Sequence, residues 1–157
     1  MRYLIFILCL LLAGCDLMGN DRKAKKKETE TQAAIQKVLA ERNDIRQVIS
    51  HQPQNAVELA AANHDPSVLV FDVQDYVKRL RMIPLKGCPE DFKTAFVSYA
   101  EAWNDRAASN PNLVLPLKAE SGTHVENNPE AAERTQSTWR ALQDIVTKYM
   151  APSPTGS

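Results

Sequence analysis

Residues 88–103 read CPEDFKTAFVSYAEAW, and this stretch decides the fold of the chain. Proline at the first helical position, followed by Glu90 and Asp91, is a typical helix start, because carboxylates complement the positive end of the helix dipole. The stretch then carries aromatic side chains at steps of four, three and four: Phe92, Phe96, Tyr99 and Trp103. This spacing puts four rings on one face of a helix. Such a face is most often part of a domain core, and an aromatic ligand cage is the alternative interpretation.

The segment 28–52 is predicted to be an amphipathic helix that ends at Pro53, because proline cannot continue it. Its apolar residues recur at steps of three and four: Ile35, Val38, Leu39, Ile45, Val48 and Ile49. The charged residues of this segment, including Arg42 and Arg46, are expected mostly on the opposite face, toward solvent.

Two further helices are expected before residue 88. The first is short and covers 53–62, where alanines raise the helix propensity. The second begins at Asp65 and Pro66, a capping residue followed by proline, and reaches Pro84. Residues 67–71 taken alone favour a strand, but no other segment offers a convincing strand partner, so we expect a helix there as well.

The last helix is predicted from Asn128 to Pro152. Its apolar face contains Thr135, Trp139, Leu142, Ile145, Val146 and Tyr149. The connector 110–127 before it is broken by proline and glycine, and its length indicates a functional loop. The sequence therefore predicts an all-α, single-domain bundle of four or five helices over 28–151, with a disordered tail over 152–157.

The beginning of the chain indicates where the protein is located. Residues 3–13 form a short apolar run behind Arg2, and small residues then lead to Cys15. This pattern resembles the lipobox of bacterial lipoproteins, in which the leader is removed, the cysteine thiol is joined to diacylglycerol and the freed amine is acylated, commonly with palmitate. The resemblance implies that residues 1–14 are a signal peptide and that Cys15 is lipidated. A retained transmembrane anchor is the alternative, but the apolar run is shorter than the roughly 20 residues that a bilayer requires.

The residues that follow are expected to form a lipidated basic tether over 15–27. In the Gram-negative lipoproteins that the chain resembles, aspartate at the position of Asp16 commonly retains the protein at the inner membrane, on its periplasmic side. Five basic residues then occur within six positions: Arg22, Lys23, Lys25, Lys26 and Lys27. Beside an acyl anchor they are expected to contact anionic headgroups, at about 1 kcal/mol per charge. A solvated start of the first helix is the alternative.

The composition excludes several classes of protein. The chain has 19 Lys+Arg and 19 Asp+Glu, and loss of Arg2 with the leader leaves its net charge near zero. We therefore expect that nucleic acid is not a partner. No nucleotide-binding or hydrolase motif is present, and His51, His64 and His124 lack the spacing of metal ligands. We therefore expect no cofactor, no metal and no enzyme activity.

Cys88 is the one thiol expected in the mature chain, because Cys9 leaves with the leader and Cys15 carries lipid. At a helix N-terminus near Lys86, its pKa could fall, which would make it a reactive thiol. A buried or capping cysteine is the alternative interpretation.

Residues 73–149 are similar to segments of small uncharacterised bacterial lipoproteins and secreted proteins, a resemblance that implies no activity. We therefore expect a membrane-anchored accessory lipoprotein that binds or assembles with another protein of the cell envelope. An immunity or inhibitor lipoprotein against a periplasmic toxin or lytic enzyme is the alternative. A thiol-dependent enzyme that uses Cys88 is a third interpretation.

Overall fold

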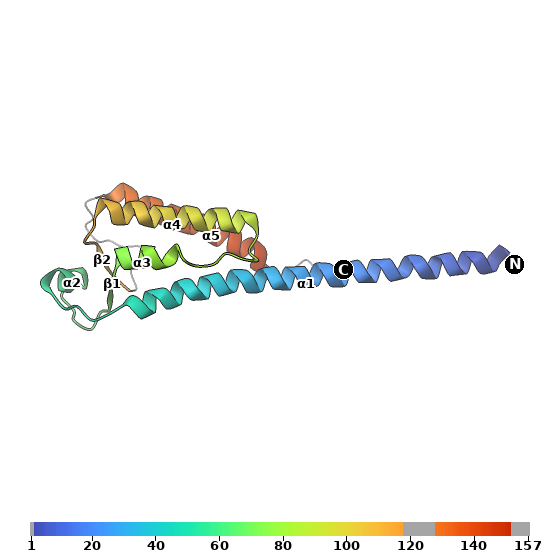
Figure 1. Ribbon diagram of the computed structural model, residues 1–157, viewed down its shortest axis with the longest axis horizontal. Helices are drawn as coiled ribbons and strands as arrows, with labels where there is room; N and C mark the ends of the chain where they lie inside the picture. Colours follow the sequence, from blue (N-terminus) through green and yellow to red (C-terminus); the bar gives the residue numbers. More distant parts are fainter. Residues whose placement is uncertain (1, 118–127, 152–157) are drawn as a thin grey trace.

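The computed structural model describes residues 2–117 and 128–151, with side chains from Lys23 onward (Figure 1). Within these ranges the chain forms the helices α1 (Arg2–Ile49), α2 (Ala56–Ala61), α3 (Val73–Leu80), α4 (Glu90–Ser109) and α5 (Pro129–Met150). Two short strands, β1 (Val70–Asp72) and β2 (Val114–Pro116), form one antiparallel sheet. The predicted all-α bundle is confirmed for the described residues, with this small sheet added to it.

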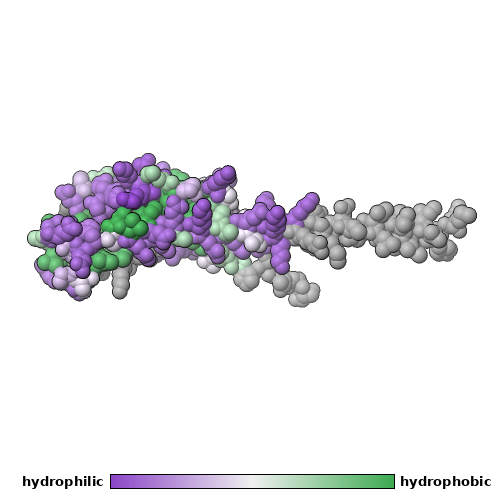
Figure 2. All heavy atoms as spheres, turned by 60° about the horizontal axis from the view of Figure 1, so that its bottom comes forward, coloured by the Kyte–Doolittle hydropathy of each residue, from purple (hydrophilic) through white to green (hydrophobic). Residues whose placement is uncertain are grey.

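The long helices lie side by side (Figure 1). α4 packs along α5 and against α3, and α1 contacts α3, α5 and β1. The N-terminal half of α1 continues beyond the body, and α2 and the strands lie at the opposite end (Figure 1). Figure 2 shows that hydrophilic residues cover the described part of α1 that leaves the body, whereas hydrophobic residues gather on the body.

The aromatic face of α4 forms the centre of the core. Phe92, Phe96, Tyr99 and Trp103 are all at most 4% exposed. Tyr76 of α3 meets Trp103 edge to face, with 5.1 Å between the ring centroids. The core interpretation of this aromatic face is therefore confirmed.

The helix predicted from Asp65 to Pro84 is wrong in its first part. Asp65 caps a turn through the backbone N–H of Ser67, and the helix N-cap is Asp72, which accepts from the N–H of Asp75. Residues 70–72 form β1, whose partner β2 lies in the connector that the sequence analysis treated as a loop. The strand is stabilised because Val70 and Phe71 are fully buried.

The polar face predicted for the first helix is also partly wrong. Arg42 and Arg46 are only 4% and 6% exposed, so both lie on the core side of α1. Val48, expected in the core, is 73% exposed. Arginine can be buried here because its apolar stem and flat guanidinium pack on aromatic rings that other elements supply.

Other expectations concern the ends of the helices and of the chain. α2 and α5 begin at the side-chain caps Asn55 and Asn128, and the second of these starts is where the sequence predicted it. The segment 15–27, expected as an irregular tether, belongs to α1, in keeping with the high helix propensity of its lysine, arginine, alanine, leucine and methionine residues. The expected tail 152–157 lies outside the described residues. Within the described ranges, no helix is long and apolar enough to cross a bilayer.

Candidate functional site

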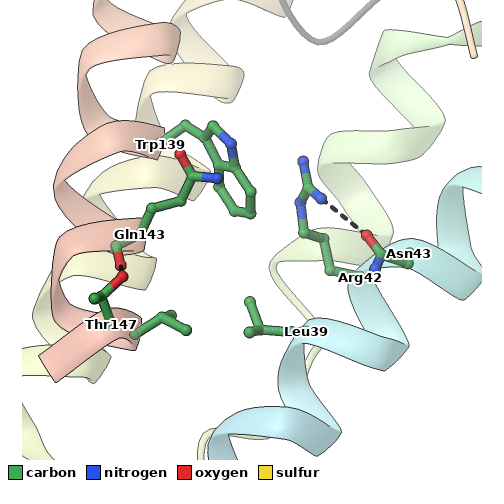
Figure 3. A pocket seen from close by; sticks show the side chains of 7 residues that line it. Leu39, Arg42, Asn43, Trp139, Gln143 and Thr147 are labelled. Carbon is green, nitrogen blue, oxygen red and sulfur yellow. Dashed lines mark hydrogen bonds between the residues drawn. The ribbon is translucent and has the colours of Figure 1, made fainter. Parts of the chain in front are cut away.

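A groove of about 370 Å³ lies between α1 and α5 (Figure 3). Its described lining consists of Leu39, Arg42, Asn43, Trp139, Gln143, Val146 and Thr147. Its volume lies in the range of small-ligand sites, and it forms because α5 packs mainly along α4, so that the facing sides of α1 and α5 are not fully closed on each other.

At one end of the groove, Arg42 stacks on Trp139. The guanidinium carbon lies 4.0 Å from the centroid of the indole ring and 5.5 Å from that of Tyr99. Figure 3 shows the two side chains reaching toward each other from α1 and α5. A cation over an aromatic face is attracted by the ring quadrupole, and more strongly where water is excluded.

Hydrogen bonds fix the position of Arg42. Its Nε and one terminal nitrogen donate to the hydroxyl of Tyr99 at 3.1 and 2.9 Å, and the other terminal nitrogen donates to Asn43 Oδ1 at 2.9 Å. The Tyr99 hydroxyl lies 3.3 Å from that of Tyr76. Burial raises the pKa of Tyr76 well above its ordinary value, so its phenol stays neutral. Hydrogen bonds therefore connect Arg42, at this end of the groove, to the buried tyrosines of the core.

Amide side chains of α1 contact the last turn of α5 outside the described lining of the groove. Gln32 Nε2 donates to the carbonyl oxygen of Tyr149 at 2.9 Å, and Gln36 Nε2 lies 3.9 Å from the sulfur of Met150. These contacts hold the last turn of α5 against α1.

Apart from the guanidinium of Arg42, the groove offers neutral hydrogen-bonding groups over an apolar floor. Leu39 and Val146 supply the apolar surface, while Asn43, Gln143 and Thr147 supply amide and hydroxyl groups. Asn43, Gln143 and Thr147 are all exposed to solvent. None of the seven lining residues carries a carboxylate, imidazole or thiol, so this lining suits recognition of an uncharged polar segment rather than acid–base or nucleophilic chemistry.

Two more arginines are buried around the same core. Arg46 lies 5.1 Å from the ring centroid of Phe71 and donates to the carbonyl oxygen of Leu117 at 2.6 Å. Arg106 lies 4.9 Å from the Trp103 ring, and burial lowers its pKa to about 10. Arg42 and Arg46 were not predicted as site residues from the sequence. Their spacing could have indicated that they face the core, because both continue the three- and four-residue steps of the apolar face of α1.

Cys88 lies in the core just before α4 and is 5% exposed. The chain turns into this position at Gly87, whose φ of 86° favours glycine. Burial raises the pKa of the Cys88 thiol, and the charge of Lys93 opposes this only in part. This environment supports the interpretation of Cys88 as a packed cysteine over that of a reactive thiol.

The remaining predicted site residues lie apart from the groove. Cys15 and Asp16 belong to the first part of α1, and Lys23, Lys25, Lys26 and Lys27 are exposed farther along that helix. The side chain of Arg22 lies outside the described residues.

The histidines are not brought together by the described residues. His51 Nε2 lies 3.2 Å from Glu58 Oε2, and His64 is exposed with a φ of 61°. His124 lies outside the described residues. Among the residues that the structure describes, no cluster of histidine, cysteine and carboxylate side chains could hold a metal ion.

A comparison with models of protein families, with curated proteins and with solved structures gave no match. The groove between α1 and α5 combines the stacked pair of Arg42 and Trp139, amide and hydroxyl groups, and an apolar floor.

Proposed function

We propose that this chain is a lipid-anchored accessory protein of the bacterial cell envelope, which binds another envelope protein in the groove between α1 and α5. The observation that carries the proposal is this groove, whose amide and hydroxyl groups stand over an apolar floor. Amide groups both donate and accept hydrogen bonds, and so does a polypeptide backbone. These groups of the lining can therefore pair with the backbone of a bound segment without a charge on that segment.

The spacing of the lining favours an extended segment of the partner. Leu39 and Asn43 on α1 are one helical turn apart, about 6 Å along the axis. Two residues of an extended chain cover about 6.6 Å, so alternate positions of a bound segment match one turn of the helix. An apolar side chain of the segment would meet Leu39 and Val146, while its backbone would meet Asn43 and Gln143.

The length of the lining limits how much of the partner can enter. On α5, the lining residues from Trp139 to Thr147 span about 12 Å, which corresponds to roughly four extended residues. The proposed ligand is therefore the tip of a loop, uncharged at the residues that enter the groove.

The first half of α1 supports the anchored part of the proposal. Between Cys15 and Gln32, which donates to Tyr149 of α5, the helix covers about 25 Å. The described lysines of this stretch are exposed, which leaves them accessible to anionic headgroups at about 1 kcal/mol per charge. The lipid at Cys15 would hold the groove near the membrane, where an envelope partner is concentrated.

Site-specific photocrosslinking in intact cells tests the proposal. A photoreactive amino acid at Gln143 or Thr147 of the full chain should give a discrete adduct with one envelope protein. Ala141 is the matched control, since it is exposed on the same helix about 200° around the axis from Gln143. The same adducts from all three positions, or none from Gln143 and Thr147, would contradict the proposal. An adduct with a toxin or lytic enzyme would identify the inhibitor form of the same binding function.

A further inference from the structure

A second groove, apolar and separate from the first, lies between α3 and α4. It has a volume of about 140 Å³ and is lined by Leu80, Arg81, Ile83, Leu85, Phe96, Val97, Ala100 and Glu101. Val97 is 47% exposed, and Met82, which directly precedes Ile83 in the chain, is 74% exposed. The groove and these two side chains together leave apolar surface exposed on this side of the molecule.

The charges beside this groove are opposite and self-complementary. Arg81 directly follows α3, Glu101 belongs to α4, and both line the groove. Arg81 donates to Asn104 Oδ1 at 3.3 Å, and Asn104 lies three residues after Glu101. Along the axis of α4, the charges of Arg81 and Glu101 are therefore within about one helical turn of each other. Both are exposed, and neither is in an ion pair with another described side chain.

We propose that this groove is the contact surface for a second copy of the chain. A twofold axis parallel to the bundle would bring Arg81 of each copy to Glu101 of the other, with Val97 and the apolar groove in the same interface. One surface that carries both members of a charge pair is what a twofold interface requires, because the same patch must complement itself.

The direction of this axis also agrees with the course of α1. An axis parallel to the bundle leaves both N-terminal halves of α1 projecting on the same side of the dimer (Figure 1). Two chains anchored in one membrane could therefore associate without either chain inverting its orientation relative to the membrane. This step rests on the proposed lipid anchor, whereas the self-complementary groove does not. Anchoring would also raise the effective concentration of a weakly associating pair.

Cysteine crosslinking of the full chain tests the dimer. Membrane and soluble fractions of cells that express Val97→Cys are treated with a short bismaleimide and examined on denaturing gels. We expect a dimer band from Val97→Cys and little from Val57→Cys, a control residue that is 64% exposed in α2. Comparison of the two fractions separates the dimer proposal from the lipid-anchor proposal. If lipidation fails, the protein moves into the soluble fraction but keeps its dimer-forming surface.

Charge reversal tests the pairing itself. In the Val97→Cys chain, Arg81→Glu or Glu101→Arg should lower the dimer yield about fivefold, because each creates two like-charge contacts across a twofold axis. The double reversal should restore the yield, since the charges are complementary again. Equal dimer yields from Val97→Cys and Val57→Cys would overturn the proposed surface. Failure of the double reversal to recover the dimer would overturn the Arg81–Glu101 pairing.

Discussion

The guanidinium of Arg42 lies 4.0 Å from the centroid of the Trp139 ring and joins α1 to α5 across the end of their groove. The same guanidinium donates two hydrogen bonds to the hydroxyl of Tyr99 on α4. One side chain of α1 therefore contacts both of the other long helices. The groove and the core share this contact, so a change at Arg42 should affect both.

Replacement of Arg42 by alanine should lower the free energy of unfolding by about 2–4 kcal/mol, because it removes the stack on Trp139 and the donors to the buried Tyr99 hydroxyl. Arg42→Lys should recover only part of this loss, since an ammonium cannot stack and donate in the same plane. Urea denaturation followed by circular dichroism measures both. Arg140→Ala, at an exposed position of α5, is the control. Equal stability of Arg42→Ala and this control would contradict the role given to Arg42.

The aromatic face of α4 should behave as core in stability measurements. Phe92→Ala and Phe96→Ala should each cost about 3–5 kcal/mol, since both rings are buried and each would leave a cavity. Val97→Ala, a half-exposed position on the same helix, should change the stability much less. Thermal unfolding distinguishes this outcome from a ligand cage, in which all three variants would melt like the unchanged chain.

The helices α4 and α5 could be predicted from the sequence because their signals are local. Pro89, Glu90 and Asp91 mark the start of α4, and Asn128 caps the first turn of α5 with its own side chain. The four aromatic residues of α4 also carry their spacing within 12 residues of sequence. Signals of this kind do not depend on what the helix later contacts.

The strand and the groove depend on partners that are distant in the sequence. Phe71 pairs with Leu115 in strands of three residues each, too short for a periodic pattern to show. Arg42 is buried because α4 and α5 bring Tyr99 and Trp139 to it. Its charge alone indicates solvent, so the sequence analysis placed it on the wrong face.

The contacts of Asp91 should make stability depend on pH. Its carboxylate accepts from Lys148 at 2.8 Å and Tyr149 at 2.9 Å, which joins the start of α4 to the end of α5. The hydrogen bond from Lys148 is the main cause that lowers the pKa of Asp91 below its ordinary 3.8. A lowered folded pKa means that this stabilisation is complete above the unfolded pKa and is lost as the pH falls through the folded pKa.

Asp91→Asn should therefore lower the melting temperature at neutral pH, and this difference should shrink as the pH falls through the folded pKa and the unchanged carboxyl becomes protonated as well. The same contact raises the pKa of Lys148, so at high pH its contribution is lost as the pH rises through that raised value. Melting curves from acid to neutral pH provide the measurement, with Asp144→Asn at an exposed position of α5 as the control. A constant difference between Asp91→Asn and the unchanged chain at every pH would contradict the prediction.

The lipid anchor makes a prediction that is independent of the fold. Cys15→Ser should abolish labelling with a palmitate analogue and prevent removal of the leader by the lipoprotein pathway, because serine lacks the thiol that the diacylglycerol joins. Labelling, gel mobility and membrane fractionation measure the result. A labelled, membrane-bound product from Cys15→Ser would exclude this residue as the anchor. Recovery of the unchanged protein in the outer membrane would contradict the sorting role of Asp16.

Cys88 should react slowly in the folded chain. Its side chain is 5% exposed in the core, and burial raises the pKa of the thiol, so both access and the thiolate fraction are reduced. We expect alkylation at neutral pH to be at least about tenfold slower in the native chain than after denaturation. The introduced thiol of Val57→Cys, at a position 64% exposed, gives the rate for an accessible thiol in the same fold.

Cys88→Ala should cost on the order of 1 kcal/mol through a small cavity and leave binding in the groove unchanged. Fast alkylation of native Cys88 at pH 6, together with loss of cellular function in Cys88→Ala, would instead identify a thiol that takes part in chemistry.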